Sequence, residues 1–367
     1  MNRHNGSASG DRCPARPPIA LLHLHLARTG GTTVRGWAAA NAGNGHLFDR
    51  AHGYTCAARC FAQQHSDLLG VATTPRRCPR DLDWRSMRLA VEFHGDSFNF
   101  FLRTVLPQLP ALRRRYEEAC GMLLAVTTVR EPVSHLFSVY HFAPPRLNAS
   151  APVGSAQMGL TAFPAWMGRA EGLQTAMLSG YEGMPRDSGY RLGMVNRLPR
   201  ERLCGDVAAR AVLAELDVVG VTSCVELLIA HLESRLRRVA APDVSHRAGD
   251  ARPRGGANAS IQQWRSDAAA HGAGRHGRCA SAAARHWGWD VLAASEQLEL
   301  LRLTRCDFGL YVDAARRATS MLGRACQPPL SHDPDSSAGG ASLVSTWRRQ
   351  AAHAAKVYQP RPGHCRG

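Results

Sequence analysis

The stretch Ile19–Asn41 constrains the fold of this chain most strongly, because three local patterns follow one another within it. It begins with a short apolar run, Ile19–Leu26, whose histidines occupy alternate positions, as in a buried strand with side chains on two faces. The loop Arg28–Thr33 follows, and an alanine-rich segment of good helix propensity then runs to Gly43, which suits a helix C-cap. The pattern predicts a strand, a glycine-bearing loop and a helix.

This loop is a candidate anion site. A strand–loop–helix unit directs backbone N–H groups and the positive end of a helix dipole at one point, where a phosphate or sulfate fits. Gly30 and Gly31 lack the Cβ atoms that would keep a ligand away from the backbone. The alternative is a tight turn that binds no ligand, and the loop by itself does not decide between the two.

Three further apolar runs predict strands separated by helical segments: Arg88–Phe93, Met122–Val129 and Asp217–Thr222. Strands alternating with helices over residues 19–222 predict a three-layer α/β fold with a central, mainly parallel sheet flanked by helices. Ligands of such sheets bind beyond the carboxyl ends of the strands. Three loops are expected at that edge: Arg28–Thr33, His94–Asp96 and Arg130–Pro132.

The rest of the chain is predicted to be helical or irregular. Residues 44–87, rich in Arg, Cys and Pro, indicate a long surface excursion. The predicted helices are Phe98–Leu106 with Ser97 as its cap, Pro132–Phe142, one or two within Thr161–Gly180, Val207–Leu216, Ser223–Arg238, Val291–Leu303 and Phe308–Leu322. The expected organisation is a polar segment at 1–18, a domain at 19–325 with a flexible insert at about 240–286, and a disordered tail at 326–367.

The formal net charge of +16 comes almost entirely from arginine, because Lys356 is the only lysine. An excess of arginine favours bidentate recognition of phosphate, sulfate or carboxylate. A GC-rich coding sequence would also replace lysine with arginine throughout, so single arginines carry little information. The positive field is physically real under either explanation.

The eleven cysteines are an odd number, so at least one has no partner within the chain. The spacing of Cys56, Cys60 and Cys78 does not indicate a zinc site, and no C-x-x-C pair occurs. Disulfides formed in an oxidising compartment are the preferred interpretation for some of them, and buried reduced thiols are the alternative.

Signals of location are few. The N-x-S sequons at Asn5, Asn148 and Asn258 agree with a secretory location. No apolar run is long enough to span a bilayer, and residues 1–18 contain no apolar core of a signal peptide, so no membrane anchor is visible.

Two blocks of sequence meet at the predicted ligand edge. The first reads His25-Leu26-Ala27-Arg28-Thr29-Gly30-Gly31-Thr32-Thr33, and the second reads Arg130-Glu131-Pro132-Val133, with Ser138 eight residues after the arginine. Together they resemble the H-I-P-K-T-G-G-T loop and the R-D/E-P-V block of the carbohydrate sulfotransferases that use 3′-phosphoadenosine 5′-phosphosulfate (PAPS), particularly the heparan sulfate O-sulfotransferase-like branch. Weaker similarities follow in the same order at Leu173–Gly180, Val218–Thr222 and Asp307–Arg317.

The resemblance implies a P-loop-NTPase-like fold and a PAPS-dependent transfer of the sulfuryl group to a carbohydrate hydroxyl, without a metal. An anionic glycan is one candidate acceptor, nucleic acid is not an expected partner, and the Golgi lumen or secretory pathway is the implied location. The residues implied to bind the 5′-phosphosulfate are Arg28, Thr29, Gly30, Gly31, Thr32 and Thr33, and those implied to bind the 3′-phosphate are Arg130 and Ser138. A salt bridge with Glu131 is the alternative role for Arg130.

The chain departs from the family pattern at catalytic positions. Arg28 stands where the family has the lysine that stabilises the transferring group, and Ala27 replaces a proline. The family's strand-end H-G-H becomes His94-Gly95-Asp96, so the general base is open between His94 and Asp96. Histidine, with a pKa of about 6.5, suits proton abstraction better than aspartate at about 3.9, so His94 is preferred with Asp96 as its substitute or orienting partner. A histidine merely satisfied at the end of the sheet is the alternative for His94.

Two other functions compete. A P-loop kinase or nucleotide hydrolase would keep the anion loop, but the G-x-x-x-x-G-K-[ST] motif and an obvious magnesium-binding aspartate are absent from the sequence. A non-catalytic basic protein that binds polyanions would use the arginines, but aromatic residues do not interleave with the basic runs, as single-stranded nucleic acid binding would favour.

Overall fold

The fold is organised around a parallel sheet with β1 at its centre. The computed structural model describes residues 13–43, 47–52, 55–71, 83–94, 96–142, 172–179, 207–240, 293–323 and 326. The described strands are β1 (Ile19–Leu24), β2 (Arg50–His52), β3 (Arg88–Phe93), β4 (Met122–Val129) and β5 (Val218–Val221). Their order is β2-β3-β1-β4-β5, and every pairing is parallel. The predicted α/β class with a mainly parallel central sheet is confirmed.

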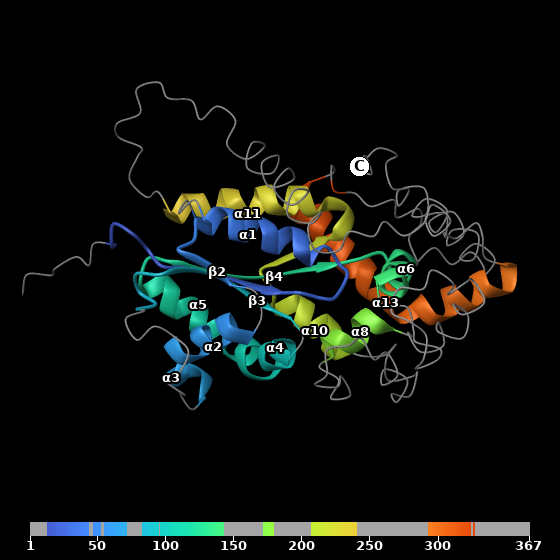
Figure 1. Cartoon of the computed structure of the whole chain (residues 1–367), viewed down its shortest axis with the longest axis horizontal. Helices are drawn as coiled ribbons and strands as arrows, with labels where there is room; N and C mark the ends of the chain where they lie inside the picture. Colours follow the sequence, from blue (N-terminus) through green and yellow to red (C-terminus); the bar gives the residue numbers. More distant parts are fainter. Residues whose placement is uncertain are drawn as a thin grey trace, which may run out of the picture.

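Helices cover both faces of this sheet (Figure 1). The described helices are α1 (Gly31–Gly43), α2 (Thr55–Gln64), α3 (Ser66–Leu69), α4 (Asp96–Phe100), the π-helix η1 (Phe101–Val105), the 3₁₀ helices η2 (Leu106–Gln108) and η4 (Thr222–Cys224), α5 (Leu109–Glu118), α6 (Pro132–Phe142), α8 (Leu173–Leu178), α10 (Val207–Glu215), α11 (Val225–Ala240) and α13 (Ala294–Leu322). Helices α1 and α11 lie on one face, and α2, α4, α5 and α10 lie on the other (Figure 1).

The alternation of side chains along β1 divides the interior into two cores. Ile19 and Leu21 pack in the core that contains residues of α1 and α11. Ala20, Leu22 and Leu24 point the other way, into the core formed with α2, α5 and α10. All of β1 is buried, and full burial of each large apolar side chain contributes roughly 1.5–3 kcal/mol. A strand buried on both faces must be central, as its apolar composition predicts.

The prediction of a surface excursion over residues 44–87 is wrong for its described part. This segment supplies the edge strand β2 and the helices α2 and α3, and Phe48 and Phe61 are fully buried. Strand β2 pairs with β3 across a long sequence separation. Such pairing depends on contacts that no local pattern in an Arg- and Cys-rich segment reveals.

The helical region after β3 also differs from its prediction. The helix begins at Asp96 instead of Phe98, and it continues through the π-helix η1 and the 3₁₀ helix η2 into α5. Ser97 lies inside this helix, where its Oγ donates to the carbonyl of His94 at 2.9 Å and accepts the His94 amide N–H at 2.9 Å. Its side chain therefore stabilises the turn after β3.

The two helices predicted over Val291–Leu303 and Phe308–Leu322 are one continuous helix, α13. Two polar residues between them are buried within this helix: Thr304 Oγ1 donates to the carbonyl of Leu300 at 2.9 Å, and Asp307 is 1% exposed. Residues 1–12, 241–286 and 327–367 of the predicted N-terminal segment, insert and tail lie outside the described residues, whereas Cys326, which the prediction placed in the disordered tail, is fully buried.

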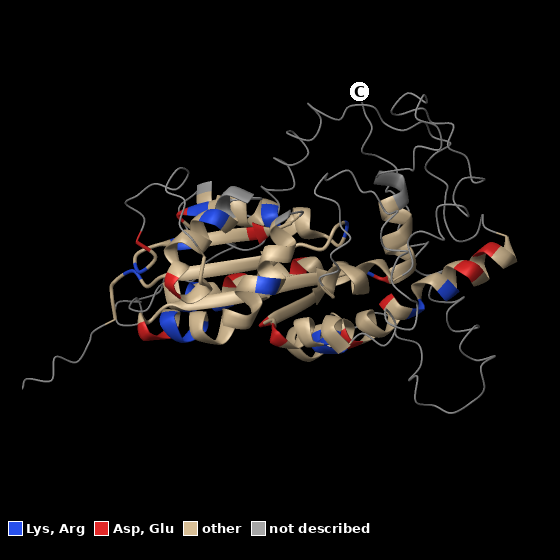
Figure 2. Ribbon diagram, turned by 90° about the horizontal axis from the view of Figure 1, so that it is seen from below, with Lys and Arg blue, Asp and Glu red and all other residues tan. Residues whose placement is uncertain are grey.

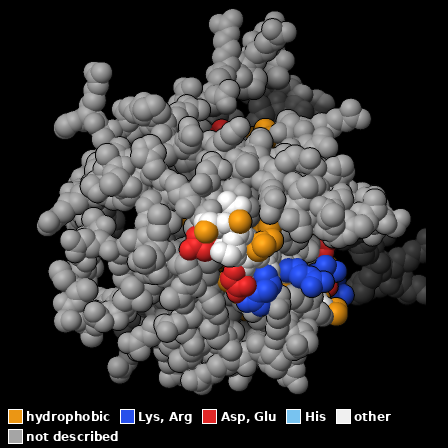
Figure 3. Space-filling view, turned by 90° about the vertical axis from the view of Figure 1, so that its right-hand side faces the viewer, with side chains coloured by type: hydrophobic (Ala, Val, Ile, Leu, Met, Phe, Trp, Pro, Cys, Tyr) orange, Lys and Arg blue, Asp and Glu red, His pale blue; other side chains and the backbone are white. Residues whose placement is uncertain are grey.

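Charged side chains of both signs are spread over the described elements (Figure 2). At the end of the molecule where α13 begins, basic and acidic groups adjoin one another (Figure 3), and Arg302 pairs with Glu299 in this part of the helix.

Candidate functional site

Three loops meet at the carboxyl edge of the sheet. Strand β1 pairs with β3 and with β4 in register to its end, so that Leu24 lies opposite both Phe93 and Thr127. After β1 the chain forms β2 and β3 on one side of β1, and it then crosses to form β4 on the other side. Ligands of open parallel sheets bind at such a change of direction. The structure thus brings together the loops that follow β1, β3 and β4.

The loop after β1 has its carbonyl groups bonded into the protein. The carbonyl oxygen of each residue from His25 to Thr29 accepts a hydrogen bond from a side chain. In chain order of the acceptors, the donors are His94 Nδ1 at 3.1 Å, Thr29 Oγ1 at 2.8 Å, His135 Nε2 at 2.8 Å, Arg130 Nη1 at 3.1 Å and Thr222 Oγ1 at 2.8 Å. Five consecutive carbonyl oxygens are therefore held by side chains from the loops after β3 and β4, from α6, from η4 and from the loop itself. Turning these negative ends inward favours an anion on the amide side of the loop.

The backbone of the loop has the shape of an anion-binding nest. Arg28 has φ +64°, Gly30 has φ +88°, and α1 begins at Gly31. Left-handed residues that alternate with right-handed ones bring successive N–H groups to one side, and the first N–H groups of a helix have no partner within it. A left-handed non-glycine such as Arg28 is energetically unfavourable and persists only where its surroundings hold it.

Each of the two glycines has a structural role in this loop. Gly30 provides the left-handed turn. A Cβ on Gly31 would overlap the ring of His25, since it would lie well inside the 3.0 Å that real Cβ contacts respect. Its missing side chain therefore makes room for the His25 ring.

The other predicted anion-binding residues lie around this loop. Arg28 Nε donates to Ser138 Oγ at 3.1 Å, and Ser138 is fully buried. Thr29 is also fully buried, and its hydroxyl lies 3.3 Å from that of Thr128, so its side chain serves the structure. Thr32 is exposed, and the amide of Thr33 donates to the carbonyl of Gly30 at 2.9 Å.

Arg130 is oriented by neighbours on both sides. Its Nε donates to Ser134 Oγ at 2.7 Å, while Nη1 donates to the Arg28 carbonyl. The carboxylate of Glu131 accepts the amides of Val133 at 3.0 Å and Ser134 at 2.7 Å, and so caps α6. Burial raises the pKa of Glu131 above its ordinary value.

Three histidines form a stack beside the loop. The ring centroids of His25 and His94 are 4.4 Å apart, and those of His23 and His25 are 5.3 Å apart. Burial and the neighbouring His25 lower the pKa of His94 below its ordinary value, so the neutral ring is favoured. Because Nδ1–H donates to the His25 carbonyl, the lone pair of neutral His94 lies on Nε2.

A buried acidic residue supports this stack. The Glu92 carboxylate pairs with His25 Nδ1, and Arg35 Nη1 lies 3.6 Å from its other oxygen. Burial raises the pKa of Glu92, but the hydrogen bond and charge of His25, with Arg35, outweigh it and bring the pKa below its ordinary value. Asp96, the alternative base, opens α4, and its side chain lies outside the described residues.

Several residues that hold the site were not predicted from the sequence. His135 and Thr222 fix loop carbonyls, and burial lowers the pKa of His135 to about 4, so it is a neutral donor. Gln174 bonds to the backbone of Arg130. His135 lies one turn into a predicted helix and Thr222 ends a predicted strand, but only the tertiary contacts show which groups they reach.

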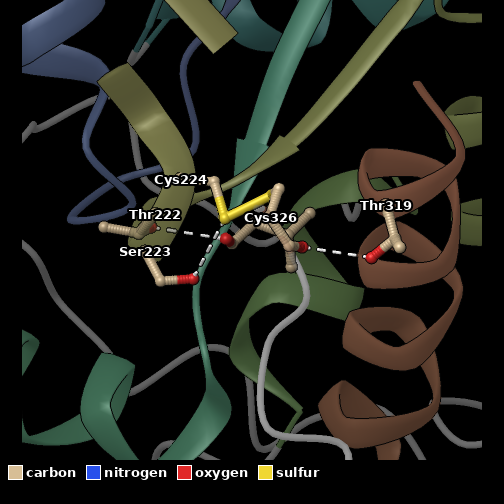
Figure 4. The surroundings of a disulfide bond; sticks show 6 residues. Thr222, Ser223, Cys224, Thr319 and Cys326 are labelled. Carbon is tan, nitrogen blue, oxygen red and sulfur yellow. Dashed lines mark hydrogen bonds between the residues drawn. A yellow bond between two sulfur atoms is a disulfide. The ribbon is translucent and has the colours of Figure 1, made fainter. Parts of the chain in front are cut away.

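Disulfides join distant segments of the chain, one of them beside the site and one near the amino ends of β1 and β4. Cys13 pairs with Cys120 and Cys224 pairs with Cys326, and Cys60 and Cys306 are also disulfide-bonded. The Cys224–Cys326 bond joins η4 to the chain just after α13, next to Thr222 (Figure 4). The predicted disulfides are confirmed for these cysteines.

No known protein family, curated protein or solved structure matched the chain when we compared it with them. Within the described ranges, no group of three or more His, Cys, Asp or Glu side chains is arranged to hold a metal ion. None of the described helices combines the length and apolar character that crossing a membrane requires.

Proposed function

We propose that this protein is a PAPS-dependent sulfotransferase, which moves a sulfuryl group to a hydroxyl of a carbohydrate acceptor. The observation that carries the proposal is the loop after β1, whose carbonyls are held inward while Arg28 and Arg130 lie beside it. A polyanionic nucleotide is the ligand whose charge this arrangement complements. The all-parallel sheet with β1 at its centre is compatible with the P-loop-NTPase-like fold that the resemblance implies.

Two phosphate positions are distinguished in this proposal. The amides of Thr29–Thr32, up to the start of α1, would hold the 5′-phosphosulfate with the Arg28 guanidinium at its edge, while the Thr33 amide is bonded to the Gly30 carbonyl. Arg130 would bind the 3′-phosphate. Ser138 Oγ accepts a hydrogen bond from Arg28 Nε, so it would position Arg28 or exchange that bond for one to the 3′-phosphate.

The transfer itself needs alignment and charge stabilisation more than covalent participation by the protein. The S–O bond to the bridging phosphate oxygen breaks as the acceptor oxygen bonds to sulfur, and the nucleotide leaves with both phosphates. Arg28 would stabilise the charge that develops on the leaving oxygen.

His94 is the proposed general base. Its tautomer places a lone pair on Nε2, and its lowered pKa keeps the ring neutral near pH 7, so it can accept the proton of the acceptor hydroxyl. Asp96, two residues later, is retained as an orienting group or substitute.

The disulfides support the proposed location in the secretory pathway or Golgi lumen. Disulfides form and persist in oxidising compartments and are uncommon in the cytosol. At least six cysteines are disulfide-bonded, counting Cys60 and Cys306 with the two described pairs.

Calorimetry with adenosine 3′,5′-bisphosphate and adenosine 5′-phosphate tests the nucleotide assignment. The bisphosphate should bind much more tightly, and Arg130→Ala should remove most of that preference. Arg114→Ala on α5 is a matched control, because this exposed arginine lies on a helix that leads into the amino end of β4. Equal affinities of the wild type for the two nucleotides would refute the assignment.

Incubation with labelled PAPS and a panel of neutral and anionic glycans tests the reaction. Transfer of label to a glycan without added metal is expected. Label transfer from ATP that requires Mg²⁺ would identify a kinase instead.

A further inference from the structure

A buried amide clamps the backbone of Arg130. Gln174, at the start of α8, is fully buried. Its Oε1 accepts the Arg130 amide N–H at 2.9 Å, and its Nε2 donates to the Arg130 carbonyl at 2.9 Å. One side chain thus satisfies both backbone groups of one residue.

The clamp replaces a missing strand neighbour. Strand β4 ends at Val129, which is also the last residue that pairs with β5. Beyond it, the N–H and C=O of Arg130 lie outside the described ladder, where burial without a hydrogen-bond partner would be unfavourable. The Gln174 amide presents a donor and an acceptor to Arg130, as an adjacent strand would. The hydrogen-bonding pattern of the sheet therefore continues for one residue beyond β4.

Gln174 is itself held by a buried carboxylate on another helix. Asp307 of α13 is 1% exposed, and its oxygens accept the Gln174 amide N–H at 3.1 Å, the Thr175 amide N–H at 2.8 Å and the Thr175 hydroxyl at 2.8 Å. The amide of Gly172 also donates to the carbonyl of Leu303 in α13, at 3.2 Å. Helix α13 therefore fixes the first turn of α8, from which Gln174 reaches Arg130.

The side chain of Arg130 is directed by this backbone. With its N–H and C=O fixed by Gln174, the guanidinium reaches Ser134 Oγ and the Arg28 carbonyl. Rotation of the peptide groups at residue 130 would move the guanidinium away from both. The backbone clamp and the two side-chain bonds therefore specify one orientation.

We propose that Gln174 is a positioning residue that, anchored by Asp307, orients Arg130 for recognition of a phosphate on the 3′ position of the nucleotide ribose. The inference rests on the proposed function, because it takes Arg130 as the group that reads this phosphate. It assigns the Leu173–Leu178 helix a role in nucleotide selection, although that helix does not belong to the phosphate loop.

The test measures the affinity ratio between adenosine 3′,5′-bisphosphate and adenosine 5′-phosphate in Gln174→Met. Methionine has a similar length and keeps the packing, but it has no amide. We expect the ratio to fall at least tenfold while the affinity for adenosine 5′-phosphate stays within twofold of the wild type. Gln64→Met is the matched control and should keep the wild-type ratio, because Gln64 ends α2 and its amide contacts Met87, ahead of the amino end of β3.

A second variant covers poor folding of Gln174→Met. Gln174→Glu retains an oxygen for the Arg130 amide and removes the donor to its carbonyl, so the ratio should fall by less than in Gln174→Met. A wild-type ratio in either folded variant, with the ratio lost in Arg130→Ala, would overturn the positioning role and leave the proposed function standing. A wild type without any preference, unaffected by Arg130→Ala, would instead overturn the proposed function and this inference with it.

Discussion

The contact between Gly31 and His25 gives a prediction that does not depend on any assignment of activity. A Cβ on Gly31 would overlap His25 Cδ2, Nε2 and Cγ. The His25 ring cannot move aside easily, because it is 6% exposed, pairs with Glu92 and stacks on His94 at 4.4 Å. Overpacking at such a site typically costs about 1–3 kcal/mol, so Gly31→Ala should destabilise the protein by that amount.

Gly309 provides the opposite case in a helix of the same protein. A Cβ there would approach only Arg210 Nη2, at 2.9 Å, which is the far end of a flexible side chain. Replacing a helical glycine with alanine ordinarily stabilises by about 0.5–1 kcal/mol. The two Gly→Ala substitutions should therefore differ in sign and by about 1.5–4 kcal/mol in total.

Urea unfolding with the disulfides intact measures this difference. The origin of the effect is checked in a His25→Ala background, where Gly31→Ala should lose most of its cost and give a coupling of about 0.5–3 kcal/mol. If Gly31→Ala is as stable as Gly309→Ala, the histidine does not occupy the space beside the loop and the explanation for the second glycine is wrong.

Three further predictions concern the proposed chemistry and the buried carboxylate. Arg28→Ala should lower kcat far more than nucleotide affinity, and Arg28→Lys should retain substantial activity; normal turnover in Arg28→Ala would exclude the loop arginine from the transfer. His94→Ala should lose about 10²–10⁴-fold in kcat with nucleotide binding intact. The wild-type kcat should fall with acidification only below pH 6.5, because the pKa of His94 is lowered from that value. An inactive Asp96→Asn beside an active His94→Ala would assign the role of general base to Asp96. Burial raises the pKa of Asp307 from 3.8 to about 6, so the folded state binds this proton more tightly and ionisation costs on the order of 3 kcal/mol. Relative to Asp307→Asn, the wild type should lose stability of that order in denaturant titrations as pH rises from about 4 to about 7, and a constant difference would contradict the burial argument.

Elements whose pattern is local could be predicted from the sequence. Strands β3 and β4 and helix α6 have their predicted bounds, because an apolar run or a proline at the first helical position acts through nearby residues. The sequence also indicated which loops would meet, since the ends of parallel strands share one edge.

Tertiary structure alone decided how those loops are held. Phe48 and Phe61 are buried because β2 pairs with a strand that comes later in the sequence, and no local pattern contains that information. Gly31 lacks a side chain because of a histidine ring six residues earlier, and Arg130 is oriented by a glutamine 44 residues later. Such contacts depend on which surfaces the sheet brings together, so the sequence supplied the candidate residues and the packing of distant segments supplied their geometry.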